Sequence, residues 1–362
     1  MQNSIIHPIP FLLLMGMLLV SQQLFAQKPK EEDNACVLNL EQSNEYYRQG
    51  KIELITEQLL PCLKGNRLNK ENTIRAYRLL TITQLYFNEP DSAAIFMGKL
   101  LKLEPEYELN NNLDPTEFIQ LYNAFRTTPI LILGLEAGGN YTFVQNLRNY
   151  SLDGTAPAAG TYTPELGYAV KLGIEIPVNK WIAIATGSAF QYNRYSLERR
   201  QFNYSQLSYE EELSWLSIPL EAKFYFSEGD FRPHFSIGAA FQYLLSANAT
   251  LERLDSLNEE LGNQTVSGPA IDRKNQRASF HIPLRASVGF MWKNVIGNGF
   301  LTARISYEYG LRNLVRPSSR YDNPTLLYDY TYVDNNFATQ CLSVEIGYAI
   351  PIYKPKLKKN KR

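Results

Sequence analysis

The sequence predicts an α+β multidomain fold, in which a small N-terminal α-helical domain precedes an eight-stranded antiparallel transmembrane β-barrel. Three observations predict this fold. An apolar run close to the N-terminus has the length of an export signal. Apolar residues then recur at helical spacing over residues 34–126. Over residues 130–353 the spacing changes to an alternation with a period of two, which is typical of strands whose two faces meet different surroundings.

The composition narrows the possible partners. The chain has 362 residues and a formal net charge of +0, so its overall charge gives no reason to expect a nucleic-acid partner. Aromatic residues make up 12% and include 24 tyrosines, which suit both strands and membrane interfaces. No residue pattern points to a cofactor, a metal site or a catalytic nucleophile.

Residues 1–26 are predicted to be a signal peptide. The apolar run "FLLLMGMLLV" is too short to span a bilayer as a helix, and "SQQLFAQ" follows it with Ala26 as the small residue before the cleavage site. No Lys or Arg precedes the run, so the positive charge of the signal rests on the amino terminus. The alternative is a buried N-terminal helix, which the polar stretch "QKPKEEDN" disfavours.

Export would allow the cysteines to oxidise. Cys36 and Cys62 flank a helical segment, whereas Cys341 lies far away in the last strand. We predict a disulfide between Cys36 and Cys62, which would stabilise the fold by about 3 kcal/mol on the chain-entropy model. The alternative is two buried free thiols. A lipid anchor on Cys36 is rejected, because the preceding "DNA" follows a charged stretch and not an apolar core.

The helical domain, residues 34–126, contains a two-helix unit twice. Breaks at Gly50 and "NEPD" separate the apolar stripes, and the final segment "DPTEFIQLYNAF" offers Asp114 as an N-cap. The pieces "YYRQGK" and "LYFNEPDSAAIFMGKLLKLEP" resemble tetratricopeptide-type repeats. This resemblance implies a scaffold that binds a peptide or a protein partner. The alternative is a packed cap without a partner.

Eight alternating segments follow over residues 130–353. The last, "CLSVEIGYAIPIY", has large apolar residues at every second position. The opposite faces of the segments carry charges, which form a predicted charge network in the barrel lumen: Glu136, Lys171, Glu175, Glu221, Lys223, Arg285, Arg304, Glu308 and Glu345. Lipid outside and polar residues inside explain both faces at once. Since eight strands leave an interior only wide enough for side chains, we expect a salt-bridged plug and not an open pore.

The connections predict the orientation. Short pieces such as "VNK" and "SEGDFRP" alternate with long polar stretches such as residues 313–335. In outer-membrane barrels the short turns lie on the periplasmic side. With an even number of strands, the helical domain and the basic tail, residues 354–362, are therefore expected in the periplasm.

The strands also resemble known families. "EIGYAIPI" resembles the C-terminal signal that outer-membrane assembly machinery reads, with Glu345, Gly347, Ile350 and Ile352 as its matching residues. "SWLSIPLEAKFYF" and "FHIPLRASVGFMW" resemble the PorT-like outer-membrane β-barrels of Bacteroidetes-type bacteria. This resemblance implies the fold and the outer-membrane location. Members of that group have been linked to protein secretion and envelope functions.

The leading hypothesis is a non-enzymatic anchor or adaptor, possible partners being outer-membrane lipid and a periplasmic protein held by the helical domain. The first alternative is a small-solute channel. A second alternative is a barrel lipid hydrolase that would use His281 with Ser279 and a loop carboxylate. A lone inward histidine is more often a satisfied polar residue, which disfavours the hydrolase.

Overall fold

The computed structural model describes residues 33–110, 113–152, 160–202, 204–258, 262–295 and 297–358. The chain forms two compact units, one made of Met1–Thr128 with Tyr353–Arg362 and the other of Pro129–Ile352. We call them the helical unit and the barrel unit. The predicted signal peptide, residues 1–26, and the end of the tail, residues 359–362, lie outside the described residues.

The helical unit contains two helical pairs and a closing helix. Helices α2 (Asn34–Gln49) and α3 (Glu53–Lys64) form the first pair, and α4 (Lys70–Tyr86) and α5 (Pro90–Leu103) form the second. Helix α6 (Thr116–Ala124) follows. Within the described residues, none of the helices is long and apolar enough to cross a membrane.

Local signals explain where these helices begin and end. Asp33 caps α2 by accepting a hydrogen bond from the backbone N–H of Ala35 at 3.0 Å. Gly50 ends α2 in the left-handed conformation with φ of 75°, which costs a residue without Cβ little. Asn69 caps α4 by accepting from the N–H of Asn72 at 2.8 Å.

The predicted cap of the last helix is wrong. Helix α6 begins at Thr116 with Pro115 as its N-cap residue, and no described side chain caps it with a hydrogen bond. The carboxylate of Asp114 instead accepts hydrogen bonds from Nε of Arg78 at 2.7 Å and from the N–H of Asn110 at 2.8 Å. A buried carboxylate gains more from a charged guanidinium than from a helix N–H, so Asp114 ties α4 to the segment before α6.

Cys36 and Cys62 form a disulfide with a Cα–Cα distance of 5.6 Å. The bond joins the start of α2 to the end of α3, and both residues belong to an apolar cluster with Leu40, Ile55 and Leu80. The disulfide therefore closes the first helical pair over its own core.

The start of the basic tail belongs to the helical unit. Leu357 forms a β-bridge with Phe125, and the N–H of Lys358 donates to the carbonyl of Ala124 at 2.8 Å. The hydroxyl of Tyr353 donates to Glu106 at 2.6 Å. Residues 353–358 are thus part of a folded unit, which the sequence pattern did not indicate.

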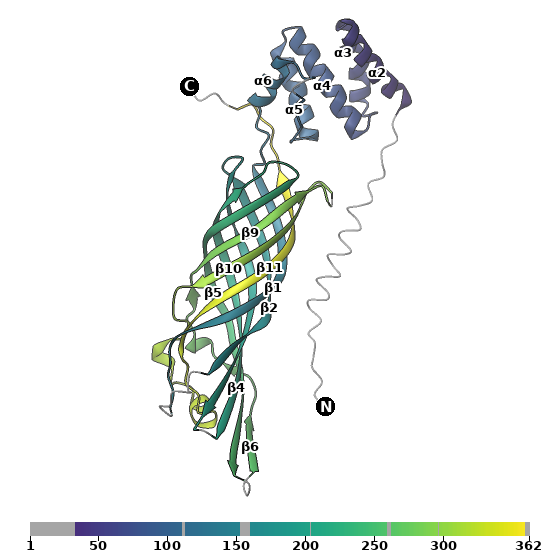
Figure 1. Cartoon of the computed structure of the whole chain (residues 1–362). Coiled ribbons are helices and arrows are strands. Elements are labelled where there is room, and N and C mark those ends of the chain that lie inside the picture. The colour runs from purple at the N-terminus through teal and green to yellow at the C-terminus, as the bar shows by residue number, and fades with distance from the viewer. Residues whose placement is uncertain are drawn as a thin grey trace. The chain divides into compact units, whose positions relative to one another are not determined.

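The barrel unit is a closed antiparallel ring (Figure 1). Its sheet has 11 strands within the described residues, and three short ones, β6 (Gly262–Ser267), β7 (Ile271–Asp272) and β8 (Phe280–His281), pair with β5 alone. The remaining eight form the ring: β1 (Leu131–Arg148), β2 (Thr161–Pro177), β3 (Ile182–Gln201), β4 (Ser205–Tyr225), β5 (Phe231–Asn258), β9 (Pro283–Lys293), β10 (Phe300–Gly310) and β11 (Asn336–Ile352). The pairing of Leu131 with Ile352 joins the first strand to the last.

The two ends of the ring differ. At the end where β1 begins, strands are joined by residues 178–181, 226–230 and 294–299, and we call this the short-turn end. At the other end, β3, β4 and β5 extend as a long ribbon, and residues 311–335 connect β10 to β11. We call this the loop end; it lies at the bottom of the view in Figure 1.

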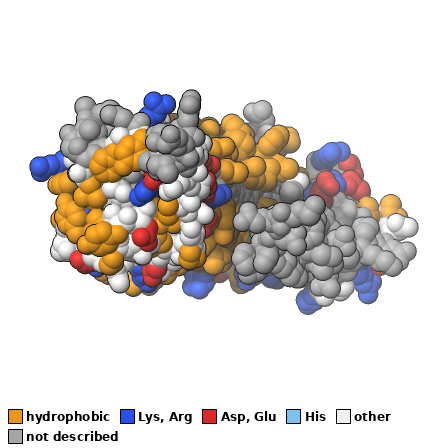
Figure 2. Space-filling model, turned by 90° about the horizontal axis from the view of Figure 1, so that it is seen from below, with side chains coloured by type: hydrophobic (Ala, Val, Ile, Leu, Met, Phe, Trp, Pro, Cys, Tyr) orange, Lys and Arg blue, Asp and Glu red, His pale blue; other side chains and the backbone are white. Residues whose placement is uncertain are grey.

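Large apolar side chains cover the outside of the ring. They come from all eight strands of the ring, and among them Leu172 is 60% and Ile346 61% exposed. Figure 2, seen from the loop end, shows broad hydrophobic patches. A protein surrounded by water rarely exposes so much apolar surface, whereas hydrocarbon favours it.

Glycines on the inner face let the strands come close beside the charged side chains. Gly238 lies opposite both Glu221 and Arg285, and Gly289 lies opposite Arg304. A Cβ on Gly238 would overlap the carbonyl oxygen of Leu220 and lie 2.7 Å from Cα of Glu221. The absence of a side chain therefore permits this close approach of backbones.

We expect Gly238→Ala to destabilise the barrel, because the added Cβ must push β4 away from β5. The measurement is the shift in mobility between folded and heat-denatured protein on gels, followed through a urea titration in detergent micelles. Gly134→Ala is the matched control, since its Cβ would meet its nearest neighbour, the Cβ of Ala349, at 3.8 Å. Equal stability of the two variants would contradict the close-approach argument.

Candidate functional site

The inside of the barrel unit holds the nine charged residues of the predicted lumen network. Seven of them are buried, and Glu136 and Lys223 are partly exposed. Each of the nine has at least one ion-pair partner among the other eight, as the following distances show.

Arg285 on β9 is one centre of this network. Its guanidinium nitrogens lie 2.8 Å from Glu221, 3.1 Å from Glu308 and 3.3 Å from Glu345. These carboxylates come from β4, β10 and β11. A single buried cation therefore connects three strands that are not all neighbours in the sequence. The planar guanidinium group has several N–H donors, so it can bind more than one carboxylate at once.

Arg304 on β10 is a second centre. It lies 2.8 Å from Glu136 and 3.6 Å from Glu221, and it also pairs closely with Glu345. Glu221 and Glu345 thus bridge the two arginines. Charges that are fully paired inside a low-dielectric region avoid most of the cost of burying them alone.

The two lysines complete the network. Lys171 lies 3.7 Å from Glu136, and Lys223 lies 2.9 Å from Glu175. Glu308 also accepts hydrogen bonds from Gln191 and Gln242, both at 3.0 Å. Four carboxylates and three cations therefore share one continuous set of polar contacts, and Lys223 and Glu175 form a separate ion pair in the same lumen.

A small cavity borders this network. It offers about 40 Å³ to the centres of water molecules and is lined by residues that include Lys223, His234 and Met291. This is room for a few waters and not for an ordinary metabolite.

The two histidines of the barrel lie far apart. His234 pairs with Gly289, and His281 pairs with Gln242, eight residues further along β5, which is about 26 Å of strand. The His281 ring packs 6.0 Å from that of Trp215, and the hydroxyl of Ser279 accepts a hydrogen bond from Arg316. Among the described residues, no group of three or more His, Cys, Asp or Glu side chains is placed to hold a metal ion.

The residues of the predicted assembly signal lie on β11. Glu345 points into the lumen network, and Gly347 faces Glu136 across the β1–β11 pair. Ile350 and Ile352 lie on the exposed outer face. The strand therefore presents its polar and its apolar residues to different sides of the sheet.

The polarity of the two faces exchanges along β4. Towards the short-turn end, Leu216, Ile218 and Leu220 are exposed on the outside. Towards the loop end, Glu210 and Glu212 lie outside while Leu213 is buried. This exchange marks the edge of the apolar band, because beyond it the outer face suits water and not hydrocarbon.

Beyond that edge the barrel has an apolar core of its own, which we call the loop-end core. It combines inward residues of the extended strands with residues of the β10–β11 loop: Tyr195, Leu197, Leu207, Tyr209, Leu213, Trp215, Leu244, Ala247, Ala249, Leu251, Leu314, Val315, Leu326, Tyr330, Tyr332 and Phe337. The loop is thus packed over the open end of the ring.

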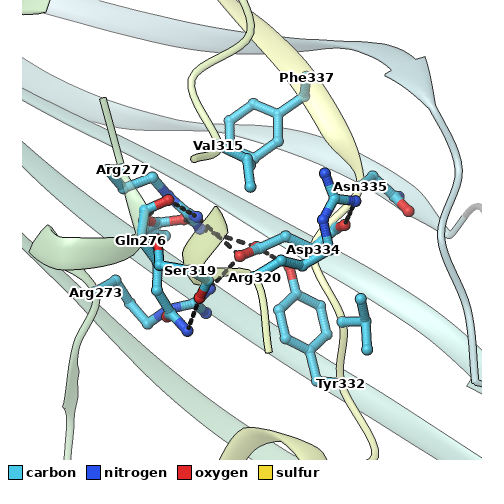
Figure 3. Close-up of polar contacts among 12 residues, drawn as sticks. Arg273, Gln276, Arg277, Val315, Ser319, Arg320, Tyr332, Asp334, Asn335 and Phe337 are labelled. Carbon is cyan, nitrogen blue, oxygen red and sulfur yellow. Dashed lines mark hydrogen bonds and ion pairs between the residues drawn. The ribbon is translucent and has the colours of Figure 1, made fainter. Parts of the chain in front are cut away.

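A second buried ion cluster lies within this core and is formed by Glu211, Arg273, Arg277 and Asp334. Figure 3 shows Arg273, Arg277 and Asp334 of this cluster. Their side chains are fully buried. Arg277 lies 2.7 Å from Glu211 and 2.9 Å from Asp334, and Arg273 also pairs with Asp334. The two arginines lie between β7 and β8, and Asp334 lies in the β10–β11 loop. The cluster therefore joins these two segments to Glu211 on β4.

Asp334 shows how the cluster is balanced. Burial by itself would raise the pKa of this carboxyl group, but the guanidinium groups of Arg273 and Arg277 outweigh burial and hold the pKa well below its usual range. The hydroxyl of Tyr332 donates to the same carboxylate at 3.0 Å. Asp334 therefore stays ionised, and its contribution to stability is lost only as the pH falls below the ordinary carboxyl range.

Sequence reasoning missed this cluster. Its arginines and Asp334 lie in segments that look like polar loops, and Glu211 stands between two other glutamates. The available signal was the set of apolar and aromatic residues inside the loop, such as Leu326, Tyr330 and Tyr332, which a solvated loop would not need.

We expect Arg285→Met to destabilise the barrel by about 3–5 kcal/mol, because it leaves three buried carboxylates without their shared cation. The measurement is urea unfolding in detergent micelles. Lys180→Met is the matched control, since Lys180 pairs with Glu228 at 2.8 Å on the exposed surface, and its loss should cost about 1 kcal/mol or less. Similar losses in both variants would argue against a structural role for the lumen network.

Comparison with known proteins gives the family. The family model of the outer membrane protein beta-barrel domain matches residues 130–316, which is 187 of the 362 residues. A comparison with curated proteins found no match.

Solved outer-membrane structures are similar at low identity. The outer membrane protein OprG from Pseudomonas aeruginosa is 11% identical with a TM-score of 0.36, over 62% of this chain and 98% of that chain. Neisserial surface protein A is 13% identical with a TM-score of 0.30, over 61% and 97%. The N-terminal barrel domain of Pseudomonas aeruginosa OprF is 10% identical with a TM-score of 0.28, over 61% and 98%.

The family match begins just before β1 and continues past the end of β10. It therefore includes most of the strands that surround the lumen network. Because it covers more than half of the sequence, the chain belongs to the outer membrane protein beta-barrel domain family and is an outer-membrane protein.

Proposed function

We propose that this protein is a non-enzymatic anchor, in which the barrel fixes the helical unit beneath the outer membrane so that it holds a periplasmic protein. We further assign the barrel to the PorT-like group of Bacteroidetes-type bacteria, on the strands "SWLSIPLEAKFYF" and "FHIPLRASVGFMW". Its role is then accessory to protein secretion or envelope assembly.

One observation carries this proposal: the helical unit is built from chain on both sides of the barrel. Its helices precede β1, and residues 353–358 return to it after β11. Two covalent connections instead of one restrict how freely an attached unit can move. Attachment through two connections is what we expect of a module that must stay at the membrane.

The orientation follows from the connections. Both covalent links leave the barrel at its short-turn end, and short turns face the periplasm in outer-membrane barrels. We therefore assign the helical unit and the tail to the periplasm. Glu345, Gly347, Ile350 and Ile352 are assigned to recognition by the outer-membrane assembly machinery.

The proposed binding role of the helical unit is supported by the arrangement of its helices. Two helical pairs in sequence resemble tetratricopeptide-type scaffolds, which recognise peptides or protein partners. Leu38 on α2 and Ile95 on α5 are 69% and 60% exposed, although both are large and apolar. Such residues are sensible positions from which to look for a partner.

A small-solute channel is the second candidate. The cavity beside Lys223 and His234 is the observation that favours it. Against it stand the ion pairs of Arg285 and Arg304, which fill the middle of an eight-stranded ring.

We expect a photo-crosslinking amino acid at Leu38 or Ile95 to trap a protein of defined mass in living cells. Tyr328 is the control position, because it is 81% exposed but lies in the β10–β11 loop at the opposite end of the barrel. Adducts from Tyr328 with the same protein, or none from several exposed helical positions, would remove the adaptor.

We expect the purified protein to produce no conductance steps in planar lipid bilayers, because ion pairs occupy the lumen. An established open porin in the same bilayers is the positive control. Reproducible steps from the unaltered protein would favour the channel over the anchor.

A further inference from the structure

Arg199, on the loop-end part of β3, is a buried cation that has no carboxylate partner within the described part of the chain. Its side chain faces inward and the residue is 2% exposed. Its Nη1 donates to the carbonyl of Val333 at 3.2 Å, while Nε and Nη2 find no hydrogen-bond partner among the residues that the structure describes. No carboxylate among the described residues pairs with it.

Such a group is costly as it stands. Removing a cation from water is unfavourable unless an anion or enough hydrogen-bond acceptors replace the water. The ring of Tyr332, 5.3 Å from the guanidinium carbon, offsets only part of that cost. The cations of the neighbouring ion cluster do not face this problem, because Arg273 and Arg277 both pair with Asp334.

The two unpartnered nitrogens are those of one edge of the guanidinium. The N–H groups of Nε and Nη2 point the same way in the guanidinium plane, which is the geometry that binds two oxygens of one carboxylate or phosphate. Arg199 lines a hollow with Ser151, Leu152, Gln201, Phe202 and Thr331. The hollow offers about 10 Å³ to the centre of a water-sized atom, so oxygen atoms of a ligand fit at its floor.

We propose that this hollow binds a small oxyanion of phosphate or carboxylate chemistry, with two oxygens accepting hydrogen bonds from Nε and Nη2 of Arg199. Leu152 and Phe202, both exposed, form the rim over which the rest of the ligand lies. Gln201 is itself held by the hydrogen bond of its Nε2 to the carbonyl of Thr331 at 2.8 Å, so the wall beside Arg199 is fixed.

The position of the hollow favours a soluble ligand over a lipid headgroup. On β3, the outward residues change from Tyr192 to the charged Arg194, which marks the edge of the apolar band. Arg199 lies seven residues beyond Tyr192, about 23 Å along the strand and about 17 Å along the barrel axis after strand tilt. Headgroups extend only about 5–8 Å beyond the hydrocarbon, so a headgroup phosphate would not reach it.

The test is isothermal titration of inorganic phosphate into the full-length protein in detergent, in Tris chloride at constant ionic strength. We expect saturable binding to the unaltered protein and about tenfold or greater loss of affinity in Arg199→Met. Arg200→Met is the matched control, because Arg200 is the next residue but lies exposed on the outer face, and it should bind phosphate normally. Acetate, titrated in the same way, tests the carboxylate.

The fold of each variant is checked by heat-dependent gel mobility. Methionine in place of an unpaired buried charge should leave the barrel as stable as before or more stable. The proposal is overturned if neither anion binds the unaltered protein saturably, or if Arg199→Met binds as well as the unaltered protein. Binding of micelle-embedded phosphatidic acid without binding of inorganic phosphate or acetate would overturn the assignment to a soluble oxyanion.

Discussion

The guanidinium of Arg285 meets carboxylates from β4, β10 and β11, and the closed barrel depends on contacts of this kind. Hydrocarbon outside the ring excludes water as a partner for any ionised group that points the wrong way. The charged residues must therefore lie inside, and once inside they must neutralise one another. The apolar outer face, the inner glycines and the ion-paired lumen are three consequences of that single requirement.

Beyond the apolar band, the same ring has apolar residues inside and charged residues outside. There the strands keep their inward and outward faces, but Leu213 is inside and Glu212 is outside. Water now surrounds the sheet, so an apolar core becomes favourable. The β10–β11 loop supplies the other half of this core, and the ion cluster around Arg277 fixes the loop in place. One continuous sheet thus serves as a membrane barrel over part of its length and as a water-exposed barrel over the rest.

The sequence predicted the membrane part of the fold much better than the loop end. Alternation alone indicated eight strands with one apolar face, because every segment in the apolar band follows the same rule. On β3 the large apolar residues change from one face to the other along the strand: Ile184 lies outside the ring in the band, whereas Leu197 lies inside beyond it. The continuation of β5 to Asn258 was not foreseen, since "SANATLERLDSLN" alternates in the polarity of a water-exposed sheet.

The contacts between residues of the candidate sites could not be predicted from the sequence for a different reason. Alternation assigns Glu221 and Arg285 to one face, but their contact depends on strand register, which the sequence does not state. Arg199 could not be identified from the sequence either, because its importance depends on the absence of a carboxylate partner among the described residues around it. For the helical unit, the position of Asp114 suggested a cap, and its actual partner, Arg78, lies 36 residues away.

The β-bridge between Phe125 and Leu357 has a consequence for the order of events during biogenesis. Leu357 follows β11 in the chain, so it leaves the ribosome after every strand of the barrel has been made. The barrel is inserted in the chain between these two residues. The helical unit therefore gains this contact only after the whole barrel has been translated, and a chain truncated directly after β11 would carry helices that lack it.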